Sequence, residues 1–138
     1  KMKKKFEFLE HTADVKFRIY GKNLNEIFSN CASAISHILS RGNKVKKKIT
    51  YKSYISGEDK ESLLYSFIDE MLYLFDAEHF IVSSAKVKIN AYGAEILFYG
   101  DNSLKYKDLD SIKAATYAEM YIREIKKGKW EAQVVVDV

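Results

Sequence analysis

The sequence has a single cysteine, no proline and no long apolar run. One thiol excludes a disulfide framework and is typical of a reducing compartment, so we expect a cytoplasmic protein. No segment approaches the roughly 18 consecutive apolar residues that a transmembrane helix needs, so we expect no membrane association. The absence of proline excludes no class of fold.

Arginine is also scarce, at positions 18, 41 and 123 only. Lys and Arg together number 23 against 19 Asp and Glu, which leaves a formal net charge of +4. Because arginine is better suited than lysine to bidentate recognition of phosphates and bases, this composition disfavours sequence-specific nucleic-acid readout. A diffuse attraction to a polyanion stays open.

The common catalytic and nucleotide-binding motifs are absent as well. No nucleophile elbow, Walker loop, CxxC, HExxH or GxGxxG spacing is present. The three histidines, His11, His37 and His79, are too scattered for their spacing to predict a zinc site. We expect His37 to lie at the boundary of the apolar stripe of its helix and His79 to begin a strand. We expect Cys31, in the apolar stripe of the first helix, to be buried and unreactive.

The sequence does contain enough apolar material for a core. Hydrophobic residues make up 47% of the chain, which excludes a disordered protein. Apolar residues recur at helical spacing over residues 24–39 and 60–75, which predicts two helices. Asn23 and Asp59 are suited to cap the starts of these helices, and Gly42 is suited to end the first.

Alternating apolar residues predict strands in most of the remaining chain. These segments are residues 15–20, 45–55, 85–98 with a turn at Tyr92–Gly93, and 133–138. The run from Val134 to Val136 is apolar on both faces, so we expect the last strand to lie centrally in its sheet.

Two further segments complete the expected fold. Residues 112–125 have the Ala, Glu and Met content of a helix, but a period of two over six positions favours a strand. Residues 100–111 are polar and predict a loop. The pattern predicts an α+β fold in a single domain, residues 1–138, with a mostly antiparallel or mixed β-sheet packed with two main helices.

The segment His11-Thr12-Ala13-Asp14-Val15 joins two short apolar stretches. Its residue types fit a turn in which Thr12 and Asp14 satisfy nearby backbone amides. They also fit a site whose oxygen ligands hold a hard cation. Residue types alone leave both interpretations open.

The last residues of the sequence favour the cation site. Asp137 follows three valines of a predicted central strand, where an unpaired carboxylate is costly to bury. If the chain ends at Val138, its α-carboxylate adds negative charge that a cation would neutralise, and a solvated tail is the alternative. Lys113 is an ordinary exposed strand residue unless Asp14 or Asp137 lies beside it.

A basic face is the second candidate site. Lys46, Lys48 and Lys52 share one side of a predicted strand with Tyr54, and this side could meet an RNA backbone. Exposed lysines also protect strand edges from unwanted pairing, so a merely solvated face is the alternative.

Four stretches of the chain, taken together, resemble the archease family. They are FEFLEHTADVKFRIYGKNLNEIF, ESLLYSFIDEMLYLFD, IKAATY and the closing pattern W-x-A-x-V-V-x-D-V. They occur in order and span nearly the whole sequence. HTADV, IKAATY and the final DV are specific in combination, whereas each alone is a weak signal.

The resemblance implies an accessory protein of tRNA splicing, not an enzyme. Archeases assist the RtcB-type RNA ligase, which joins a 2′,3′-cyclic or 3′-phosphate end to a 5′-hydroxyl after guanylylating its own histidine with GTP and a divalent metal. The family is thought to promote this guanylylation, to restore turnover and to broaden the nucleotides that the ligase accepts. RNA is expected to meet the protein through the ligase.

The resemblance also implies the site residues. Asp14, Asp137 and Val138 match the family's metal site, usually described as calcium, with another divalent cation as the alternative. Lys113 matches the functional lysine near these acids, and His11 belongs to the same motif without an assigned role.

One position departs from the family pattern. Ala118 stands where we expect a histidine after Thr-Tyr, which puts in doubt any mechanism that needs an imidazole there. Three other functions stay open: a basic RNA-binding module, a metal-assisted hydrolase built on Asp14, Lys113 and Asp137, and a general chaperone. No nucleophile motif supports the hydrolase, and no large apolar stripe predicts the chaperone.

Overall fold

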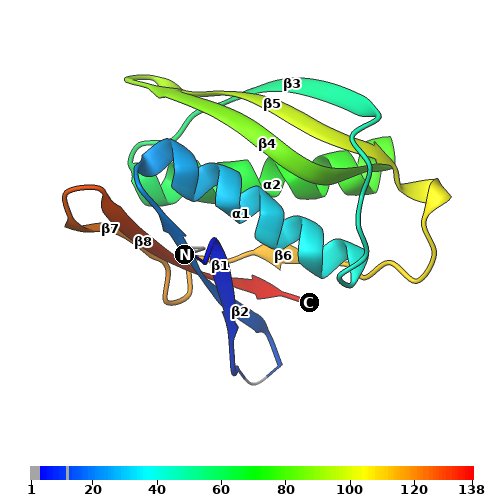
Figure 1. The fold of residues 1–138 in the computed structure, drawn as a ribbon, viewed down its shortest axis with the longest axis horizontal. Coiled ribbons are helices and arrows are strands. Elements are labelled where there is room, and N and C mark those ends of the chain that lie inside the picture. The colour runs from blue at the N-terminus through cyan, green and yellow to red at the C-terminus, as the bar shows by residue number, and fades with distance from the viewer. Residues whose placement is uncertain (1–3, 12) are drawn as a thin grey trace.

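The structure, a computed structural model, describes residues 4–11 and 13–138. This part of the chain forms two helices that lie between two antiparallel sheets (Figure 1). The elements are β1 (Phe6–Leu9), β2 (Val15–Gly21), α1 (Leu24–Ser40), β3 (Ile49–Ile55), α2 (Lys60–Glu78), β4 (Phe80–Asn90), β5 (Gly93–Asn102), a 3-10 turn (Ser103–Lys105), β6 (Ala114–Ala115), β7 (Tyr121–Lys126) and β8 (Lys129–Asp137). The predicted α+β class, with antiparallel strands packed on two main helices, is confirmed.

The strands form two sheets instead of the single sheet that the pattern suggested. One sheet has the order β3-β5-β4, and the other has the order β1-β2-β8-β6, with β7 also paired to β8. The helix α1 packs against β4 of the first sheet and β2 of the second. Its buried residues, among them Phe28, Cys31 and Ala34, cover more than one face, as in a helix enclosed between layers.

Both helices begin where the sequence predicts. The Asn23 side chain accepts a hydrogen bond from the Glu26 amide at 2.9 Å, and Asp59 forms a reciprocal capping box with Ser62. The first helix ends at Arg41, whose φ of 55° already lies in the left-handed region, one residue before the expected Gly42.

The last strand lies centrally, as predicted. In the register of β8, Val136 pairs with Val15 of β2 on one side and with Ala115 of β6 on the other. Val134, Val135 and Val136 are all fully buried, and sheet neighbours flank the strand on both edges. The chain therefore builds its larger sheet around β8.

The prediction of a single strand over residues 112–125 is wrong for residues 116–120. β6 and β7 both pair with β8, but residues 116–120 form a turn between them in which Glu119 has a φ of 54°. The Thr116 hydroxyl donates to the carbonyl of Val135 at 2.7 Å and accepts from the amide of Ala118, so it replaces the strand ladder at this point.

Three other boundaries differ from the predictions. β3 begins at Ile49, and Val45 is buried in the preceding connection instead of in a strand. The hairpin between β4 and β5 turns at residues 91–92, one position before the expected turn. The expected loop over residues 100–111 begins later, because β5 continues to Asn102 and a 3-10 turn follows.

The predicted roles of the cysteine and two histidines can be compared with the structure. Cys31 is fully buried, and burial raises the pKa of its thiol, which makes it unreactive in the folded protein. His37 is exposed and packs against the rings of Phe6 and Phe8, while His79 is the residue that ends α2, not the first residue of a strand. Neither α1 nor α2, the helices in the described part of the chain, is long and apolar enough to cross a membrane.

Candidate functional site

The sheet brings the three predicted functional residues to one end of β8. Asp14 immediately precedes Val15, which pairs with Val136, and Asp137 follows as the next residue of β8. On the other edge of β8, Asp137 pairs with Ala114, and the amide of Lys113 donates to the Asp137 carbonyl at 2.7 Å. Three residues from distant parts of the sequence therefore lie around the same strand end.

These side chains are open to solvent. The side chain of Asp14 is 36% exposed, and Asp137, Lys113 and Val138 are all exposed. Asp137 and Lys113 thus sit at the boundary between the buried valines of β8 and the surface. Thr12 of the same motif, for which hydrogen bonds to nearby backbone amides are predicted, lies outside the described residues.

Three further residues join this end of the sheet: His11, Lys16 and Glu119. His11 lies between two carboxylates, with Nδ1 3.9 Å from Oδ2 of Asp14 and Nε2 3.1 Å from Oε2 of Glu119. Lys16 of β2 donates from Nζ to the other Glu119 oxygen at 2.8 Å. The hydrogen bond from Lys16, followed by that from His11, holds the pKa of Glu119 below its usual range.

Sequence reasoning missed Glu119. The residue follows Ala118, the position at which the expected imidazole is missing, and both lie in the exposed turn between β6 and β7. The amide of the Gln133 side chain donates to the Glu119 carbonyl at 2.8 Å and anchors this turn to β8. The register of β2, β8 and β6 brings Glu119 beside His11, so no local pattern could reveal it.

The carboxylates at this end of β8 suit a hard cation, but they are few. Among residues 4–11 and 13–138, no group of three or more His, Cys, Asp or Glu side chains is arranged to hold a metal ion. The carboxylates of Asp14 and Asp137 supply hard oxygen donors of the kind that calcium and magnesium prefer. Calcium takes about six to eight oxygens, so these two residues would form only part of a coordination sphere.

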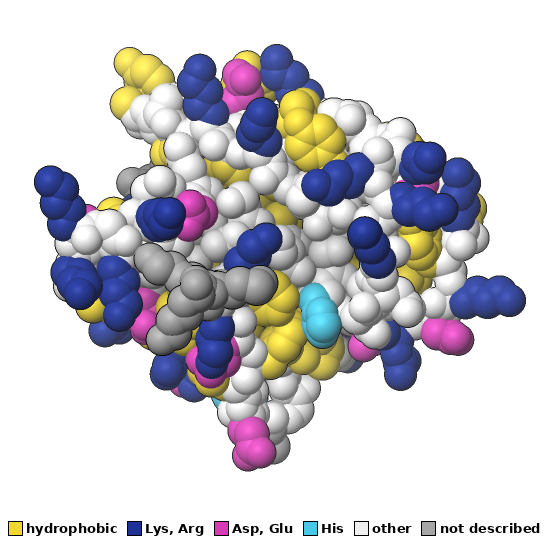
Figure 2. Space-filling view, in the orientation of Figure 1, with side chains coloured by type: hydrophobic (Ala, Val, Ile, Leu, Met, Phe, Trp, Pro, Cys, Tyr) yellow, Lys and Arg dark blue, Asp and Glu magenta, His cyan; other side chains and the backbone are white. Residues whose placement is uncertain are grey.

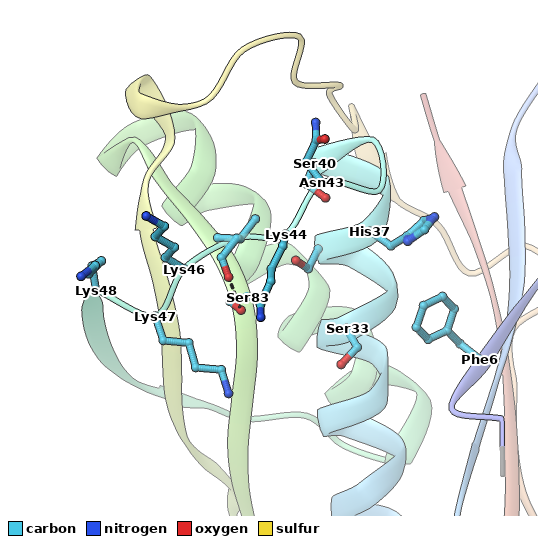
Figure 3. A pocket seen from close by; sticks show the side chains of 12 residues that line it. Phe6, Ser33, His37, Ser40, Asn43, Lys44, Lys46, Lys47, Lys48 and Ser83 are labelled. Atoms are coloured by element: carbon cyan, nitrogen blue, oxygen red, sulfur yellow. Dashed lines mark hydrogen bonds between the residues drawn. The ribbon is translucent and has the colours of Figure 1, made fainter. Parts of the chain in front are cut away.

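The basic residues predicted for RNA contact divide between two places. Lys46 and Lys48 line a shallow pocket of about 720 Å³, and Lys52 does not line it but lies exposed on β3. Figure 3 shows lysines on one side of this pocket and His37 with Phe6 on the other side of α1. The predicted contact with RNA at these lysines stays a prediction.

Four serines line the same pocket. They are Ser33, Ser36 and Ser40 of α1, together with Ser83, whose hydroxyl donates to the Val45 carbonyl at 2.9 Å. The Ser40 oxygen is buried and has no hydrogen-bond partner among the described residues. Lysine and serine residues therefore make up most of the lining, and its one aromatic ring besides His37, that of Phe6, is engaged with Phe8 and His37.

Comparisons with known proteins agree over the length of the chain. The family model described as the Archease protein family (MTH1598/TM1083) matches residues 6–138. Protein archease of Pyrococcus furiosus is 37% identical over 141 residues, which cover 98% of this chain and 99% of the relative. Protein archease of Sulfurisphaera tokodaii is 37% identical over 138 residues, which cover 97% and 99%.

A solved structure has the same fold. The solution structure of Methanobacterium thermoautotrophicum protein 1598 superimposes with a TM-score of 0.74 at 28% sequence identity, covering 97% of this chain and 99% of that one. Sequence and structural similarity thus extend across both sheets and both helices, not over a single motif.

Proposed function

Because the chain belongs to the archease family, we propose that it is an accessory protein that activates an RtcB-type tRNA-splicing RNA ligase. It promotes guanylylation of the ligase histidine and multiple turnover, and it broadens the range of nucleoside triphosphates that the ligase accepts. It carries out no bond-forming chemistry of its own. The lone cysteine and the absence of a membrane-spanning helix among the described residues are compatible with action in the cytoplasm.

One observation supports this proposal above the others: Asp14, Lys113 and Asp137 meet at one end of β8. An exposed set of two carboxylates and one ammonium group has no role in the core, since all three residues lie outside it. Such a set can contact a charged site on another protein, where opposite charges guide association and fix orientation.

The chain's own residues have distinct parts in this proposal. The carboxylates of Asp14 and Asp137, with the α-carboxylate of Val138 where the chain ends there, would hold calcium or another divalent cation. A cation held there would supply positive charge at the contact surface. Lys113, whose backbone amide donates a hydrogen bond to the Asp137 carbonyl, presents a flexible ammonium group that can bind a phosphate or carboxylate of the ligase complex.

Covalent GMP on the ligase is the direct readout. We expect the purified chain to accelerate guanylylation of its cognate ligase in GTP and a divalent metal, and to convert a single round of RNA joining into many. Asp14→Asn, Asp137→Asn and Lys113→Gln should each reduce the rate enhancement by about tenfold or more, in the range that loss of a metal-site partner costs.

Asp76→Asn is the matched control, because Asp76 is an exposed carboxylate on α2, outside the cluster. It should leave activation unchanged. Full activation by Asp137→Asn, with unaltered circular dichroism, would reject the assignment of the acidic site. No activation of a competent ligase by the wild-type chain would reject the function itself, and phosphoester turnover without ligase would favour the hydrolase.

A further inference from the structure

A second groove lies at the opposite end of β8, where the strand begins. It has a volume of about 1170 Å³ and is formed by three segments that are remote in sequence. These are the residues before β1, the end of β2 with the first turns of α1, and the hairpin between β7 and β8. Figure 2 shows basic side chains, Lys or Arg, on the side of the molecule that carries this hairpin.

The groove concentrates positive charge. Its lining contains one acidic residue, Glu26, and six lysines: Lys4, Lys5, Lys22, Lys126, Lys127 and Lys129. This local excess of five positive charges is larger than the net charge of +4 carried by the whole chain. A surface of this kind attracts polyanions and repels cations.

Few of these charges are neutralised within the protein. Lys4 pairs with Glu7 at 3.1 Å, and none of the other five lysines forms an ion pair with a described residue. Glu26 is occupied as well, because its carboxylate accepts the Lys22 amide at 3.0 Å near the start of α1. The lysine ammonium groups are thus available to an external anion.

Two aromatic residues line the groove. Trp130, the only tryptophan of the chain, lines it together with Tyr20 and is half-buried. Trp130 pairs directly with Gly21 of β2, which contributes no side chain to cover the indole. A methyl group at Gly21 would come within 3.0 Å of Glu26 and Ile27, so the backbone and the helix start pack closely here.

We propose that this groove binds single-stranded RNA, with lysines on the phosphates and a base stacked on Trp130. Basic grooves with aromatic platforms bind single strands in this way. They accept strands of different sequence, because every base has an aromatic face that can stack. The groove contains no arginine, so bidentate reading of base edges is not expected. This inference is independent of ligase activation and concerns the isolated chain.

The pocket at Lys44–Lys48 is the less suitable site. It is lined by four lysines and four serines, and its one phenylalanine is engaged with Phe8 and His37. Its lysines therefore serve as a control of equal charge. A duplex is excluded as the preferred ligand because its bases are already stacked on each other and unavailable to Trp130.

The test titrates the full chain with a labelled oligouridylate of about 12 nucleotides, following both anisotropy and the fluorescence of Trp130. We expect binding that quenches the tryptophan and weakens with salt. Lys126→Gln/Lys127→Gln/Lys129→Gln should lower the magnitude of the salt slope by about 2, because each phosphate contact on a single strand contributes roughly 0.7. Lys44→Gln/Lys46→Gln/Lys47→Gln should leave slope and affinity nearly unchanged.

Stacking is tested separately with Trp130→Leu, checked for folding by circular dichroism. This change should weaken binding several-fold without altering the salt slope. The inference is overturned if the control triple variant loses affinity instead, if a duplex or polyglutamate of equal charge binds as tightly, or if no binding occurs at low salt. In each of these cases activation of the ligase can still be measured, so the two proposals fail independently.

Discussion

Glu119 joins two elements that are far apart in the sequence. Its carboxylate accepts from Lys16 on β2 and lies 3.1 Å from the His11 ring, while its backbone occupies the left-handed region with a φ of 54°. A non-glycine residue in this conformation carries backbone strain, which the surrounding contacts must offset. The residue thus connects the β6–β7 turn to the segment that carries Asp14.

This connection predicts a pH dependence. The Lys16 and His11 contacts lower the pKa of Glu119 below its ordinary value of 4.5, so the folded state favours the ionised carboxylate. The resulting stabilisation is present above the unfolded pKa and is lost as the pH falls through the lowered one. The melting temperature of wild type should therefore exceed that of Glu119→Gln at neutral pH. The gap should shrink as the pH falls below about 4.5.

The measurement is a thermal melt by circular dichroism at a series of pH values. Glu124→Gln is a matched control, because Glu124 is exposed on β7 and has no side-chain partner among the described residues. If the difference in melting temperature between wild type and Glu119→Gln stays constant from neutral to acidic pH, the ionised Glu119 carboxylate does not have the proposed role.

Asp137 allows a test of the metal proposal without the ligase. A ligand that binds only the folded state at 100 times its Kd stabilises it by about 2.7 kcal/mol. Calcium or magnesium should thus raise the melting temperature of wild type, with a smaller rise for Asp137→Asn and for Asp14→Asn. Asp76→Asn should respond like wild type, and an equal response of all four proteins would contradict a site at these residues.

The stability of α1 depends on the N-cap that Asn23 forms with the Glu26 amide. Asn23 accepts the Glu26 amide, and without this side chain one amide of the first turn loses its partner. We expect Asn23→Ala to reduce the free energy of unfolding by about 1 kcal/mol. Urea denaturation measures this loss, and Asn23→Asp should restore most of it, since an aspartate caps equally well. Equal destabilisation by both changes would show that the cap is not the cause.

The interruption between β6 and β7 shows how an element can escape its local pattern. Alternation from Ile112 to Ile122 favours one strand, but Tyr117 stacks on Tyr65 of α2 with ring centroids 4.4 Å apart. The Thr116 hydroxyl donates a hydrogen bond to the Val135 carbonyl, in place of a backbone hydrogen bond between strands. A contact with another layer thus decided the conformation of this segment.

At the scale of the whole molecule, Phe67 links the layers. The centroid of its ring lies 5.2 Å from that of the Phe28 ring on α1 and 5.5 Å from that of the Phe98 ring on β5. All three side chains are fully buried. Both helices and the smaller sheet therefore share one core. Their side chains should lose their packing together when the protein unfolds.

We expect Phe67→Ala to reduce the free energy of unfolding by about 3–5 kcal/mol, because the cavity lies between three elements. Tyr73→Ala on the same helix, at an exposed position, should change it by less than about 0.5 kcal/mol. Urea denaturation followed by near- and far-ultraviolet circular dichroism measures both. A Phe67→Ala protein as stable as wild type would contradict a shared core.

Much of this protein was predictable from the sequence. The two helices and their caps, the burial of Cys31 and the central position of β8 all follow from local periodicity, because a side chain's burial is set by the face it occupies on its own element. The residues Asp14, Lys113 and Asp137 were selected through the motifs of the family, not through any spacing that reveals their proximity.

The tertiary structure decided which residues meet. The register of β2, β8 and β6 places Asp14, Asp137 and Lys113 at one end of the central strand, and it brings Glu119 to His11. The other end of β8 collects lysines from three segments beside Trp130. Local periodicity cannot specify such groups, because pairing between distant strands depends on the burial of the whole sheet and on the layers packed against it.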